Sequence, residues 1–347
     1  MSVTKEYFGR LGDGTEVSLY TIRTQRLCAA VSDLGAVLVR LETPDREGKM
    51  KDIVLGYDDV EHYLENPSCF GAIVGPSANR IAGASFVIDG EEYHLPVNER
   101  NNNLHSDKLF YKRFFAAEIG DNCVSFSIGL PDGDAGFPGN RDFTITYSLT
   151  DEDLRIDYKV TSDKNTVINM TNHSYFNLSG DPAKYDVLNH LLCLNSTSFT
   201  PVDDTYMTTG EIVPTAGTPF DFEKVKPVGQ DIFADNEQIR NGNGYDHNWV
   251  LDTAGDINNL AALLYSPESG ITLFVYTDEP GIQVYSGNFL DGTVKGKKGV
   301  VYEQRHGICL ETQHYPDSPN KPDWPSVVLR PGETYHSRCI FSFIVKD

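Results

Sequence analysis

The chain has 347 residues and a formal net charge of −21, from 29 Lys and Arg against 50 Asp and Glu. A surface this acidic repels phosphate backbones and anionic lipids, so we expect neither nucleic acid nor membrane as a partner. No run approaches the roughly 20 apolar residues of a membrane helix, and residues 1–17 lack the apolar segment of a signal peptide. The six cysteines are scattered without a CxxC spacing, which favours reduced thiols and a cytoplasmic location.

Apolar and polar residues alternate with a period of two in the first half of the chain. Residues 84–95 contain Asp89-Gly90, a strong signal for a tight hairpin turn. Residues 143–149 and 154–160 alternate on either side of an acidic turn and predict a second hairpin. Residues 58–64 are one of two segments that could hold a short turn of helix.

The same alternation continues in the second half, in runs such as GITLFVYTD and RCIFSFIV. Residues 222–233 are the other segment that could hold a turn of helix, although Pro227 and Gly229 interrupt it. Helical periodicity is otherwise scarce. The sequence therefore predicts one all-β domain over residues 1–347, a large antiparallel β-sandwich with few short helices.

Candidate site residues first occur in two polar stretches. Residues 73–84 place Asn79 and Arg80 between small residues and glycines, a context that would hold the arginine in place. Its donors could bind hydroxyls or a carboxylate, or they could satisfy loop carbonyls. The polar loop 95–110 contains His105, whose role the residues alone leave open.

Residues 166–180 have an unusual pattern when they are interpreted as one strand. One face carries the larger aliphatic groups, and the other is polar and weakly charged, with His173, Tyr175 and Asn177. Such a face is either solvated or a site for a polyol, and the scarcity of Lys and Glu favours the site. Further along, the Gly/Asn turn 241–245 leads into Asp246, which could accept hydroxyl groups or cap the turn.

Glu311 lies inside a run that reads as a strand, and it shares a face with Cys309, Gln313 and Tyr315. A lone Glu in a strand is often simply exposed. If its apolar neighbours desolvate it, its pKa rises and it becomes a better base near neutral pH. We expect Gln313 to hydrogen-bond near Glu311 and hold it, and His314 to lie on the opposite face.

Metal and nucleotide motifs are missing from the sequence. There is no HExxH, no Cys/His pair at zinc spacing, and no GxSxG, Walker A or GxGxxG site. His306 and Glu311 are five residues apart, which puts them on opposite faces of a strand. We therefore predict no metal site and no cofactor.

Several short segments together resemble the aldose 1-epimerase (galactose mutarotase) family, in the family's order and over essentially the full chain. They are Ala78-Asn79-Arg80-Ile81, Leu104-His105, residues 171–178 (TNHSYFNL), Asp246-His247, residues 280–285 (PGIQVY) and residues 310–313 (LETQ). The resemblance implies a galactose mutarotase-like supersandwich with an open sugar cleft.

The resemblance also implies the roles of the site residues. The base that takes the proton from the anomeric hydroxyl is Glu311, the acid that protonates the ring oxygen is His173, and His105 assists. The residues expected to bind the sugar are Asn79, Arg80, Asp246, Gln283 and Tyr175, the last of which shares the polar strand face with His173. One departure concerns the two glycines that usually follow the first histidine, because Ser106 and Asp107 occupy those positions.

The expected function is interconversion of the α and β anomers of free hexoses such as galactose and glucose, by acid/base ring opening and reclosure. The alternatives are a non-catalytic carbohydrate-binding module and an epimerase for a pentose, fucose or a hexose 6-phosphate on the same fold. A glycosidase that uses Glu311 and Asp246 is a weaker one, since a two-carboxylate mechanism has no use for the imidazole. The expected partner is a free monosaccharide, and the protein is expected to be a monomer or a homodimer.

Overall fold

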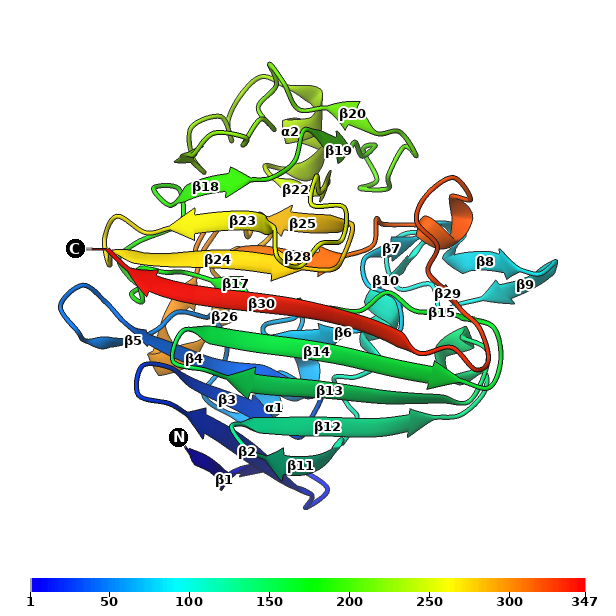
Figure 1. Cartoon of the computed structure of the whole chain (residues 1–347), viewed down its shortest axis with the longest axis horizontal. Helices are drawn as coiled ribbons and strands as arrows, with labels where there is room; N and C mark the ends of the chain where they lie inside the picture. Colours follow the sequence, from blue (N-terminus) through cyan, green and yellow to red (C-terminus); the bar gives the residue numbers. More distant parts are fainter. Residues whose placement is uncertain (1, 347) are drawn as a thin grey trace.

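The structure is a computed structural model that describes residues 2–346. Its largest sheet has nine antiparallel strands and crosses the front of Figure 1. The second predicted hairpin is confirmed as two of these strands, β13 and β14, and both bury every second residue as their alternation requires. In sheet order the strands are β11 (Ala116–Gly120), β12 (Cys123–Leu130), β13 (Arg141–Leu149), β14 (Asp153–Ser162), β30 (Tyr335–Val345), β24 (Ile271–Thr277), β23 (Leu260–Tyr265), β18 (Leu191–Leu194) and β21 (Lys226–Pro227).

Two further antiparallel sheets have six and five strands. The six-stranded sheet is ordered β17 (Tyr175–Phe176), β28 (Ile308–Gln313), β25 (Gly281–Tyr285), β22 (Asp246–Val250), β19 (Ser198–Thr200) and β20 (Val213–Pro214). Every residue of β28 and β25 is buried, so these strands are covered on both faces. The five-stranded sheet is β1 (Ser2–Arg10), β2 (Glu16–Arg23), β3 (Cys28–Ser32), β4 (Leu38–Pro44) and β5 (Met50–Asp52).

Both smaller sheets pack against the nine-stranded sheet around a shared apolar core. The ring of Phe176 in β17 lies 5.0 Å from that of Phe341 in β30, measured between centroids. The ring of Tyr20 in β2 lies 5.5 Å from that of Phe126 in β12. In Figure 1, β28 and β25 accordingly lie behind β24 and β30. This layering confirms the predicted antiparallel β-sandwich.

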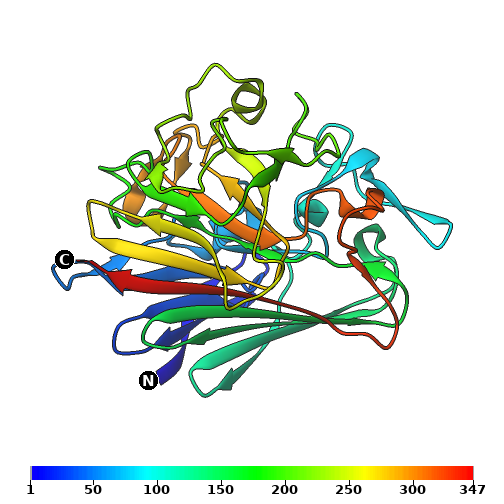
Figure 2. The ribbon, with the colours of Figure 1, turned by 45° about the horizontal axis from the view of Figure 1, so that its top comes forward.

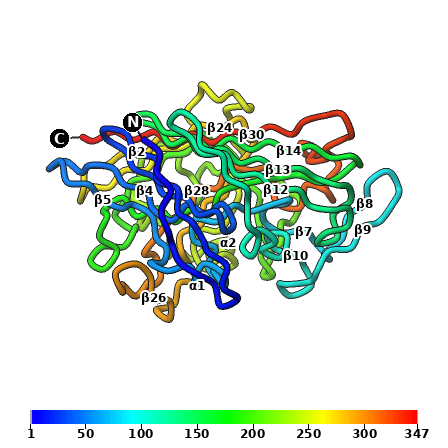
Figure 3. The backbone as a smooth tube through the Cα atoms, turned by 90° about the horizontal axis from the view of Figure 1, so that it is seen from below, coloured from blue at the N-terminus to red at the C-terminus, as the bar shows by residue number. Residues whose placement is uncertain are grey.

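Five two-stranded pairs complete the strands. They are β6 (Ala72–Val74) with β16 (Thr171–His173), β7 (Arg80–Ile81) with β10 (Asn103–Leu104), β8 (Ser85–Ile88) with β9 (Glu91–His94), β15 (Thr166–Val167) with β29 (Val328–Leu329), and β26 (Val294–Lys295) with β27 (Val301–Tyr302). The β8–β9 hairpin confirms the first predicted hairpin and projects from one end of the molecule in Figures 1 and 3. Its turn residues Asp89 and Gly90 both have positive φ, as a tight hairpin turn requires.

Helices are few and short, as predicted. The first, α1 (Val60–Glu65), matches the predicted turn of helix and begins after Asp59, whose carboxylate accepts the His62 N–H. The second, α2 (Glu237–Gly242), lies at the top of Figures 1 and 2. The helical turn expected over 222–233 is wrong, because that segment contains the short strand β21 and Pro227 offers no N–H for a helix. No helix between residues 2 and 346 is long and apolar enough to cross a membrane.

The prediction of one continuous strand over 166–180 is also wrong. The segment is divided into β15, β16 and β17, which pair with three different partners, β29, β6 and β28. Between them, Asn169 donates its backbone N–H to the Pro76 carbonyl and Met170 donates its N–H to the Tyr335 hydroxyl. These bonds break the ladder, and residues on both faces become buried.

Candidate active site

A cavity of about 470 Å³ lies where strands of the six-stranded sheet meet the β7–β10 and β6–β16 pairs. Seven of the eight predicted site residues line it, and the eighth, Gln283, does not. Gln283 is buried beside the cavity wall. The predicted residues on the wall are Asn79, Arg80, His105, His173, Tyr175, Asp246 and Glu311. Residues from distant parts of the chain therefore converge on one space large enough for a small ligand.

Backbone pairing in the six-stranded sheet fixes the relative positions of its site residues. Glu311 of β28 is paired with Gln283 of β25, and Asp246 of β22 is paired with Tyr285 of β25. The Gln283 amide donates to Asp246 Oδ1 at 2.7 Å. Gln283 therefore orients Asp246 from beside the wall, and its contact with the sugar stays a prediction.

Glu311 is the most desolvated acid of the cavity wall. It is 2% exposed, and no N–H or O–H of residues 2–346 donates to its carboxylate. The expected hydrogen bond from Gln313 is not formed, since the Gln313 amide donates to the His314 carbonyl. Burial raises the pKa of Glu311 well above its usual value, and the charge of Asp246 raises it further. A carboxylate with a raised pKa is a stronger base than an exposed one.

His173 faces Glu311 across a short gap, with its Nε2 3.7 Å from Glu311 Oε1. Burial lowers the pKa of His173 to about 4. Its Nδ1 lies 3.4 Å from the sulfur of Cys309, and burial holds the pKa of that thiol well above its usual value. This contact engages Nδ1 and leaves Nε2 as the imidazole nitrogen that faces Glu311.

Because burial disfavours both charges, the pKa of Glu311 rises while that of His173 falls. The pair then holds one proton over a wide range of pH, and the two shifts favour its residence on Glu311. Movement of that proton to His173 leaves the carboxylate and the imidazolium that an acid–base reaction needs.

His105 presents a neutral N–H donor to the same cavity. The backbone N–H of Asn79 donates to His105 Nδ1 at 3.2 Å, which leaves the imidazole proton on Nε2. Burial lowers the pKa of His105 well below its usual value, and the neighbouring His173 and Arg80 add to that shift. The rings of His105 and His173 meet edge to face at 5.4 Å. The two imidazoles therefore border the same part of the cavity.

The segment after His105 shows how Ser106 and Asp107 replace two glycines. All four residues of the 3₁₀ turn η2 (His105–Lys108) have positive φ, between 51° and 56°. Such a conformation favours glycine, so each non-glycine residue there carries backbone strain. Ser106 offsets part of this strain, because its hydroxyl donates to the Ser77 carbonyl and accepts the Ser77 N–H. The turn also places Lys108 on the cavity wall.

Arg80 is held in place by Glu99, a residue that the sequence did not single out. Arg80 Nε and Nη2 donate to the two carboxylate oxygens of Glu99 at 2.8 and 2.6 Å. This bidentate pair fixes the plane of the guanidinium group. The Nη1 donor makes no hydrogen bond with residues 2–346 and remains free for a ligand. Asn79 joins the group by accepting the Arg80 backbone N–H through Oδ1.

Aromatic side chains complete the wall. The ring of Tyr175 stacks on that of His173, with centroids 5.0 Å apart and an interplanar angle of 28°. The sequence reasoning missed Tyr206, Phe289 and Cys69, which also line the cavity. Nothing local marks these residues, since they come from loops whose approach to the site depends on the whole fold.

Two groups of three potential metal ligands occur at the cavity, and both include His173. Within each group, the ligand atoms lie within 4.8 Å of one another. The first adds Cys69 and His105, and the second adds Cys309 and Glu311. In each group, one histidine nitrogen is already engaged, by the Asn79 N–H or by the Cys309 thiol. Each of these two nitrogens could bind a metal only by giving up its present contact.

Comparison with known proteins gives a consistent result. The model of the family described as "Aldose 1-epimerase" matches residues 18–342. The chain is 40% identical to the galactose mutarotase of Homo sapiens over 347 residues, which cover 99% of each protein. It is 37% identical to the aldose 1-epimerase of Escherichia coli over 340 residues, which cover 96% of this chain and 97% of that one.

Solved structures agree with the fold. The aldose epimerase homologue from C. elegans superposes with a TM-score of 0.87 at 30% identity, covering 95% of this chain and all of that one. The galactose 1-epimerase from Lactobacillus acidophilus superposes with a TM-score of 0.86 at 26% identity, covering 100% of this chain and 99% of that one.

Proposed function

The chain belongs to the aldose 1-epimerase family and is an isomerase that interconverts anomers of hexoses, and we propose that Glu311 and His173 perform this reaction on free galactose and glucose. The observation that carries the proposal is the buried pair itself, 3.7 Å apart on the cavity wall. No other acid and imidazole of residues 2–346 lie this close together on that wall.

Ring opening is a concerted movement of two protons. Glu311, as the carboxylate, takes the proton from the anomeric O1 hydroxyl, and the C1–O5 bond breaks as the C1 carbonyl forms. His173, as the imidazolium formed when the shared proton moves to it from Glu311, donates its Nε2 proton to O5 and becomes the neutral imidazole. Each proton transfer is typically worth about 10²- to 10⁴-fold in rate.

Reclosure reverses the roles after rotation about the C1–C2 bond. The aldehyde presents its other face to the O5 hydroxyl, which returns its proton to His173 as the new C1–O5 bond forms. Glu311, now protonated, gives its proton to O1. The cycle consumes no proton and no cofactor, because reclosure returns each proton that ring opening moved.

The other residues of the cavity wall bind the substrate. The free Nη1 of Arg80 and the neutral Nε2–H of His105 can donate to sugar oxygens, and the Asp246 carboxylate can accept from sugar hydroxyls. Asp246 is oriented for this by Gln283. We assign Asn79 to the same binding group. Tyr175 stacks on His173 and holds the buried imidazole in place.

All these groups lie in one chain, so the proposed reaction needs no partner subunit, whether the protein is a monomer or a homodimer. We further propose that residues 1–347 act as one domain in the cytoplasm. The six cysteines are all free, which supports a reducing compartment. The non-catalytic sugar-binding module considered from the sequence would have no use for an acid paired with a base.

Polarimetry of freshly dissolved α-D-galactose and α-D-glucose tests the proposal, with a buffer blank to subtract spontaneous mutarotation. We expect the purified protein to accelerate the decay of rotation. Glu311→Gln and His173→Asn should each lower kcat by at least about 10²-fold, the low end of an acid or base contribution.

Matched controls are Glu118→Gln and His94→Asn. Both residues are exposed, and neither lines the cavity. Near-normal kcat in either active-site variant would refute the assigned roles. No acceleration over the blank by a folded wild-type protein would refute galactose and glucose as substrates, and pentoses, fucose and hexose 6-phosphates would then be assayed.

A further inference from the structure

A second cavity, of about 420 Å³, contains a buried acid that the proposed reaction does not use. This acid is Glu279, which comes from the connection between β24 and β25 and is 2% exposed. Among residues 2–346, none that lines the active-site cavity also lines this one. A buried carboxylate is costly unless its charge is compensated, so the partners of Glu279 indicate its role.

Two side chains donate to the two oxygens of this carboxylate. His314 Nδ1 lies 2.5 Å from Glu279 Oε2, and the Tyr335 hydroxyl donates to Glu279 Oε1 at 2.9 Å. Burial alone would raise the pKa of Glu279, but its hydrogen bonds and the charge of His314 hold that pKa below its usual value. Glu279 is therefore ionised near neutral pH, and both bonds are of the strong, charge-assisted kind.

His314 connects this acid to the strand that carries the base. It follows Glu311 by three residues and comes directly after the end of β28. The Asn169 side chain accepts the His314 N–H at 2.9 Å and donates to the His314 carbonyl at 3.2 Å. The chain that leaves β28 is thus fixed by Glu279 through its side chain and by Asn169 through its backbone.

Tyr335 connects the same acid to the strand that carries the imidazole. Its hydroxyl accepts the backbone N–H of Met170 at 3.3 Å, and Met170 precedes His173 by three residues. Asn169 is the neighbour of Met170 in the chain. One carboxylate therefore holds together the chain that leaves the base and the chain that leads to the acid. We name the four side chains of this cluster the Glu279 network: Glu279, His314, Tyr335 and Asn169.

The base and the acid belong to different strand ladders. β16, which contains His173, pairs with β6, whereas β28, which contains Glu311, pairs with β17 and β25. Within residues 2–346, β16 and β28 share no ladder. At one end, the pairing of Tyr175 with Cys309 holds the two segments together. At the other end, the Glu279 network joins them.

We propose that Glu279 is a positioning residue, which sets the separation of Glu311 and His173 from outside the active-site cavity. This inference rests on the proposed function and adds to it the group that keeps the base and the acid 3.7 Å apart. Proton transfer requires partners within hydrogen-bond reach of the reacting atoms, so a small displacement of either segment lowers the rate.

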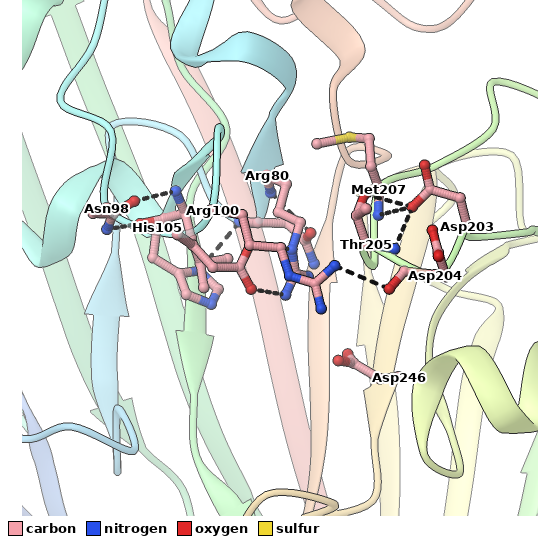
Figure 4. A network of polar contacts seen from close by, with 12 residues as sticks. Arg80, Asn98, Arg100, His105, Asp203, Asp204, Thr205, Met207 and Asp246 are labelled. Atoms are coloured by element: carbon pink, nitrogen blue, oxygen red, sulfur yellow. Dashed lines mark hydrogen bonds and ion pairs between the residues drawn. The ribbon is translucent and has the colours of Figure 1, made fainter.

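The residues proposed to bind the sugar are held independently of this network. Figure 4 shows two of them, Arg80 and Asp246, which belong to β7 and β22. Arg80 is fixed by Glu99, and Asp246 is oriented by Gln283. Loss of the Glu279 bonds should therefore lower kcat and leave KM nearly unchanged.

The experiment compares Glu279→Ala with wild-type protein by polarimetry on galactose, at a temperature where circular dichroism shows both to be folded. We expect kcat to fall at least about tenfold, since a misplacement of about 1 Å can cost about 10²-fold, and KM to change less than about twofold. Tyr335→Phe removes one of the two bonds and should lower kcat to a smaller extent. If Glu279→Ala does not fold, Tyr335→Phe takes its place in each comparison.

Matched controls come from the same cavity. Glu333→Gln and His336→Asn alter an acid and an imidazole that line it, but these side chains bond elsewhere. Glu333 accepts the Arg330 N–H, and His336 lies 3.7 Å from Asp157. Both variants should keep the kcat of the wild-type protein.

A second comparison separates mispositioning from a general structural defect, by combining Glu279→Ala with His173→Asn. Without the acid, the separation of the pair no longer limits the rate, so Glu279→Ala should cause less than about a twofold further loss of kcat. Losses that multiply in the double variant overturn the inference, as does an unchanged kcat in folded Glu279→Ala. Wild-type protein that does not accelerate mutarotation would instead overturn the proposed function.

Discussion

Replacing Glu99 with Gln tests whether the carboxylate that grips Arg80 supports both stability and substrate binding. The two hydrogen bonds measure 2.8 and 2.6 Å, and the side chains of Arg80 and Glu99 are 8% and 23% exposed. Gln keeps the shape of Glu but presents an N–H₂ group to one of the two Arg80 donors. One bond is lost, and the buried guanidinium loses its counter-charge.

The magnitude follows from these contacts. A hydrogen bond to a charged group contributes about 1.5–3 kcal/mol, and leaving a buried charge unpaired costs about 3–5 kcal/mol. Because Glu99 is partly exposed, solvent screens the pair, and we expect a loss of about 2 kcal/mol in the free energy of unfolding. A mobile Arg80 should also raise KM for galactose by about tenfold, with a smaller effect on kcat.

Urea unfolding and polarimetric kinetics on the same preparations measure both effects. The control is Glu118→Gln, which removes an exposed carboxylate without an ion pair among residues 2–346. The reasoning is refuted if Glu99→Gln changes the free energy of unfolding by less than about 0.5 kcal/mol, the range of ordinary surface substitutions, and leaves KM unchanged.

Two further predictions concern the proton balance and the strained turn. Log kcat/KM should fall below about pH 4, where His173 and Glu311 are both protonated. It should also fall above the raised pKa of Glu311, where the pair has lost its shared proton. Asp246→Asn removes a charge that raises the pKa of Glu311, so the alkaline limb should move to lower pH, and an unmoved limb would contradict this coupling. In the turn after the first histidine, Asp107→Gly should stabilise the protein by about 1 kcal/mol by relieving a positive φ. Ser106→Gly should destabilise it by about 1 kcal/mol because buried hydroxyl bonds are lost, and equal effects in urea unfolding would argue against this account.

Local pattern was sufficient for the regular parts of the fold. The Asp89-Gly90 turn and the alternation over 143–160 correctly predicted hairpins, because their signals lie within a few residues. The strand parity around Glu311 was also sound, since His314 lies on the opposite face and pairs with Glu279. Of the eight predicted site residues, all except Gln283 line the cavity.

Features that depend on distant partners could not be predicted. The break in the strand predicted over 166–180 arises because Asn169 and Met170 bond to Pro76 and Tyr335, which are far apart in the sequence. Nothing in the local sequence distinguishes Glu99 from other acidic loop residues. Its role depends on the β7–β10 pairing, which brings its loop against Arg80.

The pairing of β22, β25 and β28 has a consequence for how this protein can be altered. Asp246 and Glu311 are positioned by main-chain hydrogen bonds of one buried sheet, whereas Tyr206 and Lys108 come from connecting segments. The base and one sugar-binding carboxylate therefore share a rigid frame, whereas other parts of the wall belong to segments whose sequence can change without altering that frame.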